Sequence, residues 1–571
     1  MRRFLLIHAA PLVLLAACAG GPRPGATPTS ATFDPGGPAA SRYGLFLAGQ
    51  AALNDGRSSD AAQYFERARG DDEAGEDVVG ERAFTAALLA GDIQKAAVLA
   101  PSGDTASEGG VRLGRLVRAV EAMADGKGKD AQALFAEDAI GFPHRAAVAL
   151  LSPWAAAQAG DAEGALVRPQ AGSDKLVEYI GQLGQAGLFE RAKRYDEAET
   201  DFKALAQGEN PTEMAVLAYG GFLERRGRRL DAVALYDTAL KDNRSASLQA
   251  ARARASGGKA PPAAPTLREG AAQALLGPAA AMLAAKQNQI GLAYLRLALR
   301  LDPQRNEGWL MVGDLMAQMG DLDAARAAYA KPRAGSPEFY TARSKLAWAY
   351  QNDGDKAAAV KLAREAAATG DSDARLNLAD ILRVNEQFAE SAQILTGLIG
   401  EASKPDWRLL YARGVSYERL ARWPEAEADL KAALALKPEE PELLNYLGYS
   451  WIDRGERLPE AMAMVEKAVA ANPKSGAMID SLGWAHYRLA DYRKAVEFLE
   501  QAVELDAGDP EINNHLGDAY WRVGRRDEAQ FQWRRVLTLD PDAKIKADAE
   551  GKLASGLGPK GPAPAPRVAG Q

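Results

Sequence analysis

The sequence has few of the side chains that build metal and thiol chemistry. It contains one cysteine, Cys18, and four histidines in 571 residues. Zinc and iron–sulfur sites need several Cys or His ligands at short spacing, so we expect no metal site and no cofactor. Stretches rich in Lys and Arg are also missing, and the net charge is only −7. Nothing in the charge pattern therefore indicates a nucleic-acid-binding surface.

Recognisable catalytic motifs are missing as well. The sequence has no His-Glu-x-x-His, no Gly-x-Ser-x-Gly and no phosphate-binding loop. Gly257-Gly258-Lys259 lacks both the leading glycine spacing and the Ser or Thr that would follow the lysine in such a loop. Acidic clusters such as Asp71-Asp72-Glu73 lie where turns are expected and are typical of solvated loops. We therefore predict that the protein is not an enzyme and binds no small-molecule substrate.

The one strongly apolar run lies at the start of the chain. Arg2 and Arg3 precede the apolar stretch 4–15, and Leu15-Ala16-Ala17-Cys18 ends it. The run is shorter than the ~20 residues of a membrane-spanning helix, which makes that alternative the weaker one. The segment resembles a bacterial lipoprotein signal, implying that residues 1–17 are a signal peptide and that Cys18 is lipidated.

The alternative is an ordinary signal peptide with a chance cysteine, but the only thiol falls on the one position that lipidation needs. Ala19 follows the cysteine where an Asp would imply retention at the inner membrane. This likeness to bacterial lipoproteins implies an outer-membrane anchor, with the protein facing the periplasm. Residues 18–40 are rich in Pro and Gly, so we expect a flexible tether.

The rest of the chain is rich in Ala and Leu and carries an internal repeat. Between Pro405 and Pro541 one pattern occurs three times: a small residue in an apolar run, a polar turn, an alanine, and a closing Pro or Asp-Pro. The small residues and the alanines recur at steps of about 34 residues, the period of a helix–turn–helix repeat. They are Gly448, Gly483 and Gly517, and Ala461, Ala495 and Ala529. The pattern resembles the tetratricopeptide repeat family, which implies an all-α, right-handed superhelical solenoid.

The alanine position can be followed back along almost the whole chain. Successive steps are 32 to 35 residues, except for one step of 59 between Ala232 and Gly291. The small residue should let the second helix of each pair approach the first closely. From these steps we predict the following organisation: degenerate repeats at 41–250, a Pro/Gly/Ala linker at 251–266, tetratricopeptide repeats at 267–541, a capping helix at 542–555 and a disordered tail at 556–571.

Aromatic and polar side chains recur on the first helices of the last repeats. The family resemblance implies that such positions face the groove, where aromatic, amide and guanidinium groups grip extended peptides. An alternative is that the aromatic residues pack between repeats. His486 occupies a packing position of the repeat and His515 a different position, which predicts that His486 lies in the core, that His515 lies on the surface and that they share no site. The predicted groove residues are Asn445, Tyr446, Tyr449, Asp480, Trp484, Tyr487, Arg488, Asn514, Asp518, Trp521 and Arg522.

The lysines of the carboxylate clamp found in chaperone-binding members of the family are absent. Asp480 and Asn514 stand at corresponding places, so nothing supports binding of a chaperone tail. The stretch NYLGYSWIDRGERLPEAMAMVEKAVAANP and the following DSLGWAHYRLADYRKAVEFLEQA resemble outer-membrane adaptor lipoproteins of carboxyl-terminal processing proteases. This likeness implies a periplasmic scaffold that presents peptidoglycan hydrolases or other envelope proteins to such a protease. One alternative is a scaffold for polysaccharide export, pilus assembly or outer-membrane protein insertion. A repeat-containing glycosyltransferase is disfavoured, because the repeats leave no room for a further domain.

Overall fold

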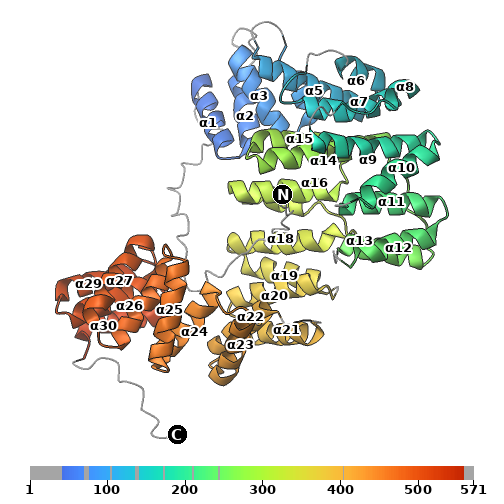
Figure 1. Ribbon diagram of the computed structural model, residues 1–571. Coiled ribbons are helices and arrows are strands. Elements are labelled where there is room, and N and C mark those ends of the chain that lie inside the picture. Colours follow the sequence, from blue (N-terminus) through green and yellow to red (C-terminus); the bar gives the residue numbers. More distant parts are fainter. Residues whose placement is uncertain are drawn as a thin grey trace. The chain divides into compact units, whose positions relative to one another are not determined.

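The computed structural model describes residues 41–558, apart from 70–75, 103–105, 136–139, 171–173, 209–210, 242–244, 369, 403 and 405. The predicted signal peptide 1–17, Cys18 with the tether 18–40, Asp71-Asp72-Glu73, and the tail from residue 559 lie outside the described residues. Within these ranges every regular element is an α-helix, thirty in all (Figure 1). The predicted all-α class is therefore confirmed. None of the described helices combines the length and the apolar character needed to cross a bilayer.

The chain divides into two compact units, and the boundary between Ala374 and Arg375 falls within the first turn of α20. We call the described residues 41–374 the N-terminal unit and the described residues 375–558 the C-terminal unit. The helices of the N-terminal unit are α1 (Arg42–Asn54), α2 (Ser58–Arg69), α3 (Glu76–Ala90), α4 (Ile93–Leu99), α5 (Glu108–Ala124), α6 (Gly128–Phe135), α7 (Arg145–Ala159), α8 (Ala162–Ala165), α9 (Lys175–Arg191), α10 (Tyr195–Ala206), α11 (Glu213–Arg225), α12 (Arg229–Ala239), α13 (Ala246–Ser256), α14 (Leu267–Ala284), α15 (Asn288–Leu301), α16 (Asn306–Met319), α17 (Leu322–Tyr329), α18 (Glu338–Asn352) and α19 (Lys356–Ala367).

The C-terminal unit follows the same hairpin pattern to its end. Its helices are α20 (Ser372–Val384), α21 (Phe388–Glu401), α22 (Trp407–Arg419), α23 (Trp423–Leu436), α24 (Pro441–Arg454), α25 (Leu458–Ala471), α26 (Gly476–Arg488), α27 (Tyr492–Leu505), α28 (Pro510–Arg522), α29 (Arg526–Val536) and α30 (Ala543–Ser555). Helices with extensive mutual contact are adjacent or next but one in sequence. The unit is therefore a sequential stack, which is how repeat arrays bury the apolar face that one hairpin leaves exposed. Helix α30 packs on α28 and α29, at the position predicted for a capping helix.

The close approach of paired helices has the predicted cause. A methyl group added at Gly517 of α28 would lie 2.5 Å from the indole nitrogen of Trp533 on α29. One added at Gly483 of α26 would lie 2.7 Å from Leu499 on α27. Glycine at this position therefore makes room for a large side chain sixteen residues later. The facing alanines, such as Ala461 and Ala495, are completely buried.

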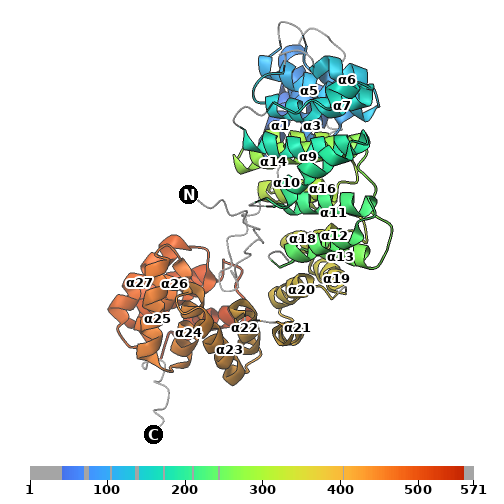
Figure 2. The same ribbon diagram turned by 45° about the vertical axis from the view of Figure 1, so that its right-hand side comes forward.

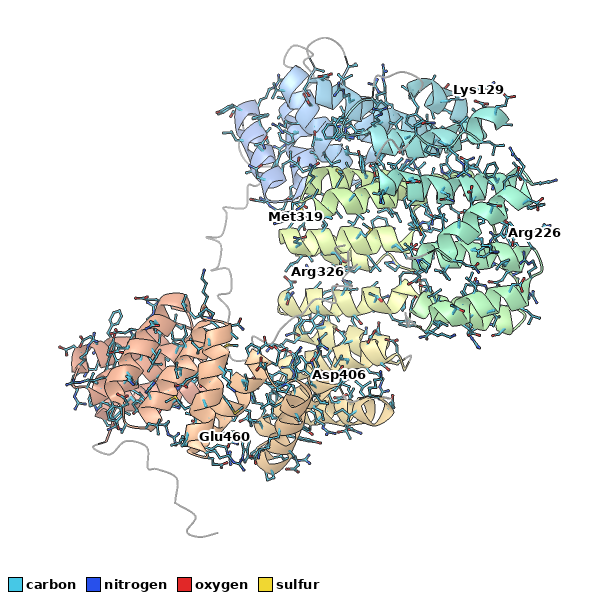
Figure 3. The ribbon with its side chains drawn as sticks, in the orientation of Figure 1. Lys129, Arg226, Met319, Arg326, Asp406 and Glu460 are labelled. Carbon is cyan, nitrogen blue, oxygen red and sulfur yellow. The ribbon has the colours of Figure 1, made fainter. Side chains whose placement is uncertain are left out.

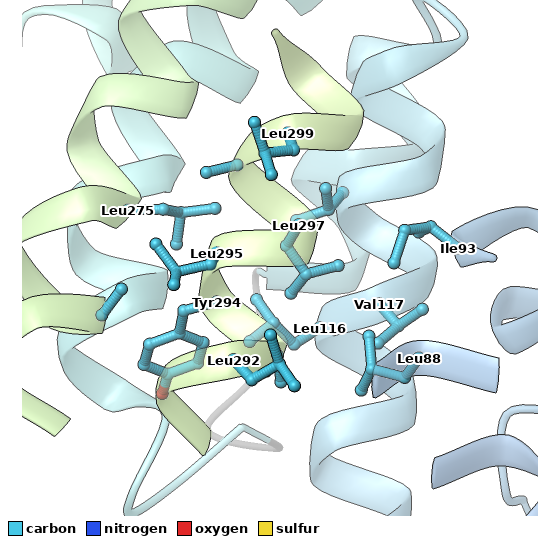
Figure 4. Close-up of a cluster of buried hydrophobic side chains, with 14 of the residues drawn as sticks. Leu88, Ile93, Leu116, Val117, Leu275, Leu292, Tyr294, Leu295, Leu297 and Leu299 are labelled. Carbon is cyan, nitrogen blue, oxygen red and sulfur yellow. The ribbon is translucent and has the colours of Figure 1, made fainter. Parts of the chain in front are cut away.

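In the N-terminal unit, the hairpin α14–α15 packs against helices that are distant in sequence. It contacts α7 and α9 through α14, and α3, α4 and α5 through α15 (Figures 1 and 2). Leucines of this hairpin interdigitate with Leu88, Leu116 and Val117 of α3 and α5 in a shared core (Figure 4). This arrangement is not a linear stack. The degenerate repeats and the first regular hairpins are therefore parts of one body.

Polar contacts fix the same junction. Nδ1 of His144 and the hydroxyl of Tyr294 lie 2.8 Å apart. The guanidinium of Arg300 donates to both carboxylate oxygens of Glu121 at 2.8 Å. Each of these contacts joins residues at least 150 positions apart in the sequence.

The predicted linker 251–266 needs correction in two respects. Its first six residues belong to α13, because the prolines that stop a helix come only at 261, 262 and 265. The remainder does not separate two arrays. Arginines at the ends of α9 and α11 hold it, since Arg191 donates to the carbonyl of Pro265 and Arg225 to that of Pro262, both at 3.1 Å.

Candidate functional site

The predicted groove residues lie together on the side of the C-terminal unit formed by the first helices α24, α26 and α28, which we call the first-helix face. Contacts link α24 to α26 and α26 to α28 directly. The hydroxyl of Tyr449 on α24 donates to Glu511 on α28 at 2.8 Å, reaching across the intervening repeat. Burial, together with the Glu511 carboxylate and those of Asp480 and Asp453, holds the pKa of Tyr449 well above its usual value. The phenol therefore keeps its proton and remains a hydrogen-bond donor.

An aromatic stack and an ion pair fill the middle of this face. The indole of Trp484 is stacked between the ring of Tyr487, with centroids 4.5 Å apart, and the imidazole of His515, at 3.9 Å. Nδ1 of His515 lies 3.0 Å from each carboxylate oxygen of Asp480. All four side chains are buried, with exposed fractions of 8% or less. The stack thus joins α26 and α28.

The charge state of His515 follows from its neighbours. Burial alone would lower its pKa, but the carboxylate of Asp480, with Glu511 and Asp518 nearby, raises the pKa to about 9. The imidazole is therefore protonated at neutral pH and paired with Asp480. The expectation that His515 lies on the surface is wrong, because Asp480, one repeat earlier, supplies the partner that makes its burial possible. His486, predicted to be in the core, is half-buried against Phe498.

The last repeat of the face is covered by α30. Nζ of Lys552 donates to Asn514 at 3.1 Å and to Asp518 at 2.9 Å. The Asn514 amide in turn donates to Asp548 at 2.8 Å. Asp518 also accepts from the indole of Trp533 at 3.0 Å, so its buried carboxylate has two charged or polar partners. These contacts use most of the polar atoms through which Asn514 and Asp518 could bind a partner.

The residues that follow α30 also contact α28. The indole N–H of Trp521 donates to the carbonyl of Leu557 at 3.1 Å. A terminal nitrogen of Arg522 donates to the carbonyl of Gly558 at 2.7 Å, while its Nε donates to the hydroxyl of Tyr487. The chain thus places its own backbone on the end of the first-helix face.

The eleven predicted groove residues therefore fall into two groups. Five are buried, and their side chains mainly pack or pair within the unit: Asp480, Trp484, Tyr487, Asn514 and Asp518. This corrects the prediction that they line an open groove, and for Trp484 and Tyr487 the packing alternative describes the structure. The other six are half-buried: Asn445, Tyr446, Tyr449, Arg488, Trp521 and Arg522.

Two of the predicted groove residues have a buried polar atom without a hydrogen-bond partner among the described residues. These atoms are Oδ1 of Asn445 and the indole nitrogen of Trp484. An unsatisfied buried polar group costs about 1–3 kcal/mol. The spacing of the repeat could place both residues on the first helices, but it gave no sign that these atoms would lack partners.

A pocket of about 400 Å³ lies in the N-terminal unit, where α9 and α11 end and α10 begins. Glu190, Arg225 and Ala264 help to line it, with Arg226, which is labelled in Figure 3 and stacks 3.8 Å from the centre of the Tyr195 ring. Arg225 donates to both oxygens of Glu190 and to the carbonyl of Pro262. Its donors are therefore committed to holding the chain after α13 against the helix ends. No pattern in the sequence predicts this pocket.

The acidic and histidine side chains of the described residues pair with neighbours and do not gather into a metal-binding group. No group of three or more His, Cys, Asp and Glu side chains in the described ranges is placed to hold a metal ion. The buried histidines are occupied, His144 with Tyr294 and His515 with Asp480. The buried charged groups of the first-helix face are paired with one another, Asp480 with His515 and Asp518 with Lys552.

Comparison with protein families identifies the repeats. Residues 344–406, 411–476 and 487–548 match the tetratricopeptide repeat family. These three segments of the chain are similar to tetratricopeptide repeats. Repeats of this family indicate a scaffold for protein–protein interaction, and neither of the two matching models describes a catalytic family. The matches begin in α18, so most of the N-terminal unit lies outside them.

Solved structures that match part of the chain include a tetratricopeptide repeat protein from Parabacteroides merdae, 13% identical, which covers 44% of this chain and 98% of its own, with a TM-score of 0.38. One chain of an APC/C hetero-tetramer, Cut9-Hcn1, matches at 17% identity over 90% of this chain and 96% of that chain, with a TM-score of 0.39. A thermophilic tetratricopeptide repeat protein from Thermus thermophilus is 22% identical over 32% of this chain and all of its own, with a TM-score of 0.29. No curated protein matches the sequence.

Proposed function

We propose that the protein is a lipid-anchored periplasmic adaptor that presents cell-wall hydrolases or other envelope proteins to a partner protease. The observation that carries the binding role is the first-helix face of the C-terminal unit. There the helices α24, α26 and α28 bring tyrosines, an asparagine and arginines from three repeats onto one side. Such side chains combine apolar area with donors and acceptors, and they are enriched at protein interfaces.

The surface available for a partner is the α24–α26 part of this face. Asn445, Tyr446 and Arg488 are half-buried, so each retains area that a partner can cover. Tyr446 packs edge-on against Tyr411, 5.6 Å between ring centres, and its hydroxyl donates to Glu418. Its ring is therefore held in one orientation, which lowers the conformational entropy lost on binding.

The proposed periplasmic location rests on the first eighteen residues of the sequence. Arg2 and Arg3, the apolar run and the single Cys18 support a lipidated N-terminus, and a lipid anchor would confine partners to the membrane surface and the periplasm. The role as a protease adaptor rests on the sequence likeness of the stretches 445–473 and 480–502 to adaptor lipoproteins. These two supports are independent, so each can be tested without the other.

The test is recovery of partners from cross-linked cells through a tag on the full chain, with lipid labelling of Cys18 followed in parallel. We expect a periplasmic processing protease and a cell-wall hydrolase with the native chain, and at least tenfold less of both with Tyr446→Ala combined with Arg488→Ala. Phe531→Ala is the matched control, because this aromatic is 59% exposed on the second helix α29, away from the face. Recovery of secretion or barrel-assembly proteins in their place would overturn the adaptor role and favour an assembly scaffold.

A further inference from the structure

The three residues that follow α30 lie on the first-helix face in the manner of a bound peptide. Gly556 ends the helix with φ of 67° and ψ of −178°, a conformation that disfavours any residue with a Cβ. A methyl group added at Gly556 would collide with the six-membered ring of Trp521. Glycine is therefore required here both by the backbone conformation and by the contact with the indole.

The next two residues are held through their main chain. Leu557 and Gly558 offer successive carbonyl oxygens, one to the indole N–H of Trp521 at 3.1 Å and the other to the guanidinium of Arg522 at 2.7 Å. The Leu557 side chain packs beside the core of the C-terminal unit. Main-chain hydrogen bonds of this kind bind an extended peptide largely independently of its side chains. The close contact of Gly556 with the Trp521 indole, in contrast, leaves room only for glycine.

These contacts are additional to the capping of the solenoid. Helix α30 already covers Asn514 and Asp518 through Lys552 and Asp548. The segment 556–558 reaches further along α28 and covers Trp521, the last residue but one of this helix. Gly558 itself is exposed, and Leu557 is only half-buried, so the segment can leave without opening the core.

We propose that Trp521 and Arg522 form a subsite for an extended, glycine-containing peptide, which the free chain fills with its own residues 556–558. The subsite deepens, and rests on, the protein-binding role proposed above. A partner peptide that places a glycine on the indole and two carbonyls on Trp521 and Arg522 must displace the chain's own segment. Because that segment is tethered directly to α30, it competes at an effective concentration on the order of millimolar.

The test uses the full chain and a fluorescent peptide SGLGPK, which copies residues 555–560. Gly556→Val in the full chain should eject the segment, because the branched side chain cannot share space with the Trp521 ring. We expect this variant to bind the peptide, by fluorescence anisotropy, at least tenfold more tightly than the native chain does. A chain that ends at Ser555, and so keeps α30, should behave like the Gly556→Val variant.

Two controls define the subsite. Arg522→Ala added to Gly556→Val should weaken peptide binding at least fivefold, and a peptide with valine in place of the first glycine should bind at least tenfold more weakly. Equal binding by native and Gly556→Val chains, or no binding by the Gly556→Val and shortened chains, would overturn the subsite. Either result leaves the proposed adaptor role standing if the cross-linked partners are still recovered. Loss of those partners with peptide binding intact would instead overturn the adaptor role.

Discussion

The two units build solenoid hairpins in different ways. In the C-terminal unit each hairpin rests on its sequence neighbours, whereas in the N-terminal unit α14–α15 returns to pack on α3, α5, α7 and α9. The difference follows the strength of the repeat pattern. Where the small residue and the alanine recur with aromatic residues, neighbouring hairpins complete one another's cores. Where the pattern is degenerate, a distant hairpin supplies the missing apolar surface.

The units also hold their buried histidines in opposite charge states. Burial, with a smaller contribution from the Arg112 guanidinium, lowers the pKa of His144 to about 4, so it is neutral at pH 7. His515, paired with Asp480, has its pKa raised to about 9 and is charged. Protonation of His144 in acid therefore destabilises the N-terminal unit. Charged His515 stabilises the C-terminal unit until it loses its proton at alkaline pH.

Removing the stacked indole should affect the C-terminal unit alone. Trp484→Ala deletes the ring that lies between Tyr487 and His515, and we expect a loss of about 4 kcal/mol of unfolding free energy. Calorimetry of the full chain should show a lower transition temperature for this unit and an unchanged one for the N-terminal unit. An unchanged melting curve with lost partner binding would instead make Trp484 a groove residue.

Alkaline pH should destabilise the C-terminal unit. The folded pKa of His515, about 9, lies above the ordinary value of 6.5, so its contribution is fully present below pH 6.5 and is lost as pH rises to about 9. The loss should reach roughly 3 kcal/mol. Denaturant titrations between pH 6.5 and 9.5 measure it, and His515→Gln should flatten the dependence. A native pH profile identical to that of His515→Gln would contradict the ion pair.

Acid should destabilise the N-terminal unit through its own histidine. The pKa of His144 is about 4 in the folded protein and about 6.5 in the unfolded chain, so below pH 6.5 the unfolded chain takes up a proton that the folded protein does not. The N-terminal unit therefore loses stability as the pH falls from about 6.5 towards 4. We expect a loss of up to roughly 3 kcal/mol in this unit. Titration of the imidazole by NMR checks the cause directly, and a midpoint near 6.5 would exclude it.

Crowding the junction between α7 and α14 should have a smaller effect on stability. A side chain at Gly270 would overlap the ring of Trp154, so we expect Gly270→Val to cost about 2 kcal/mol in the N-terminal unit only. Gly80→Ala in α3 is the matched control, because no atom lies within 4 Å of the added methyl group. Equal stabilities of the two variants would show that α14 does not pack closely on α7.

The hairpin fold and its spacing could be predicted because they depend on small residues at a fixed period. Gly483 and Gly517 are needed where Leu499 and Trp533 approach, and that need leaves a pattern in the sequence. The packing of α14–α15 on helices distant in sequence left no such pattern, because nothing in the sequence marks Arg300 and Glu121 as partners. The burial of Asn514 and Asp518 was missed for a similar reason, since Lys552 and Asp548, which cover them, belong to α30, outside the repeat pattern.

The most direct test of the central claim is photo-cross-linking from the first-helix face in living cells. A photoreactive amino acid at position 446, on α24, should form adducts with another protein. The same residue at position 531, on the exposed side of α29, should form none. Adducts from position 531 and none from position 446 would contradict the assignment of the first-helix face as the protein-binding surface.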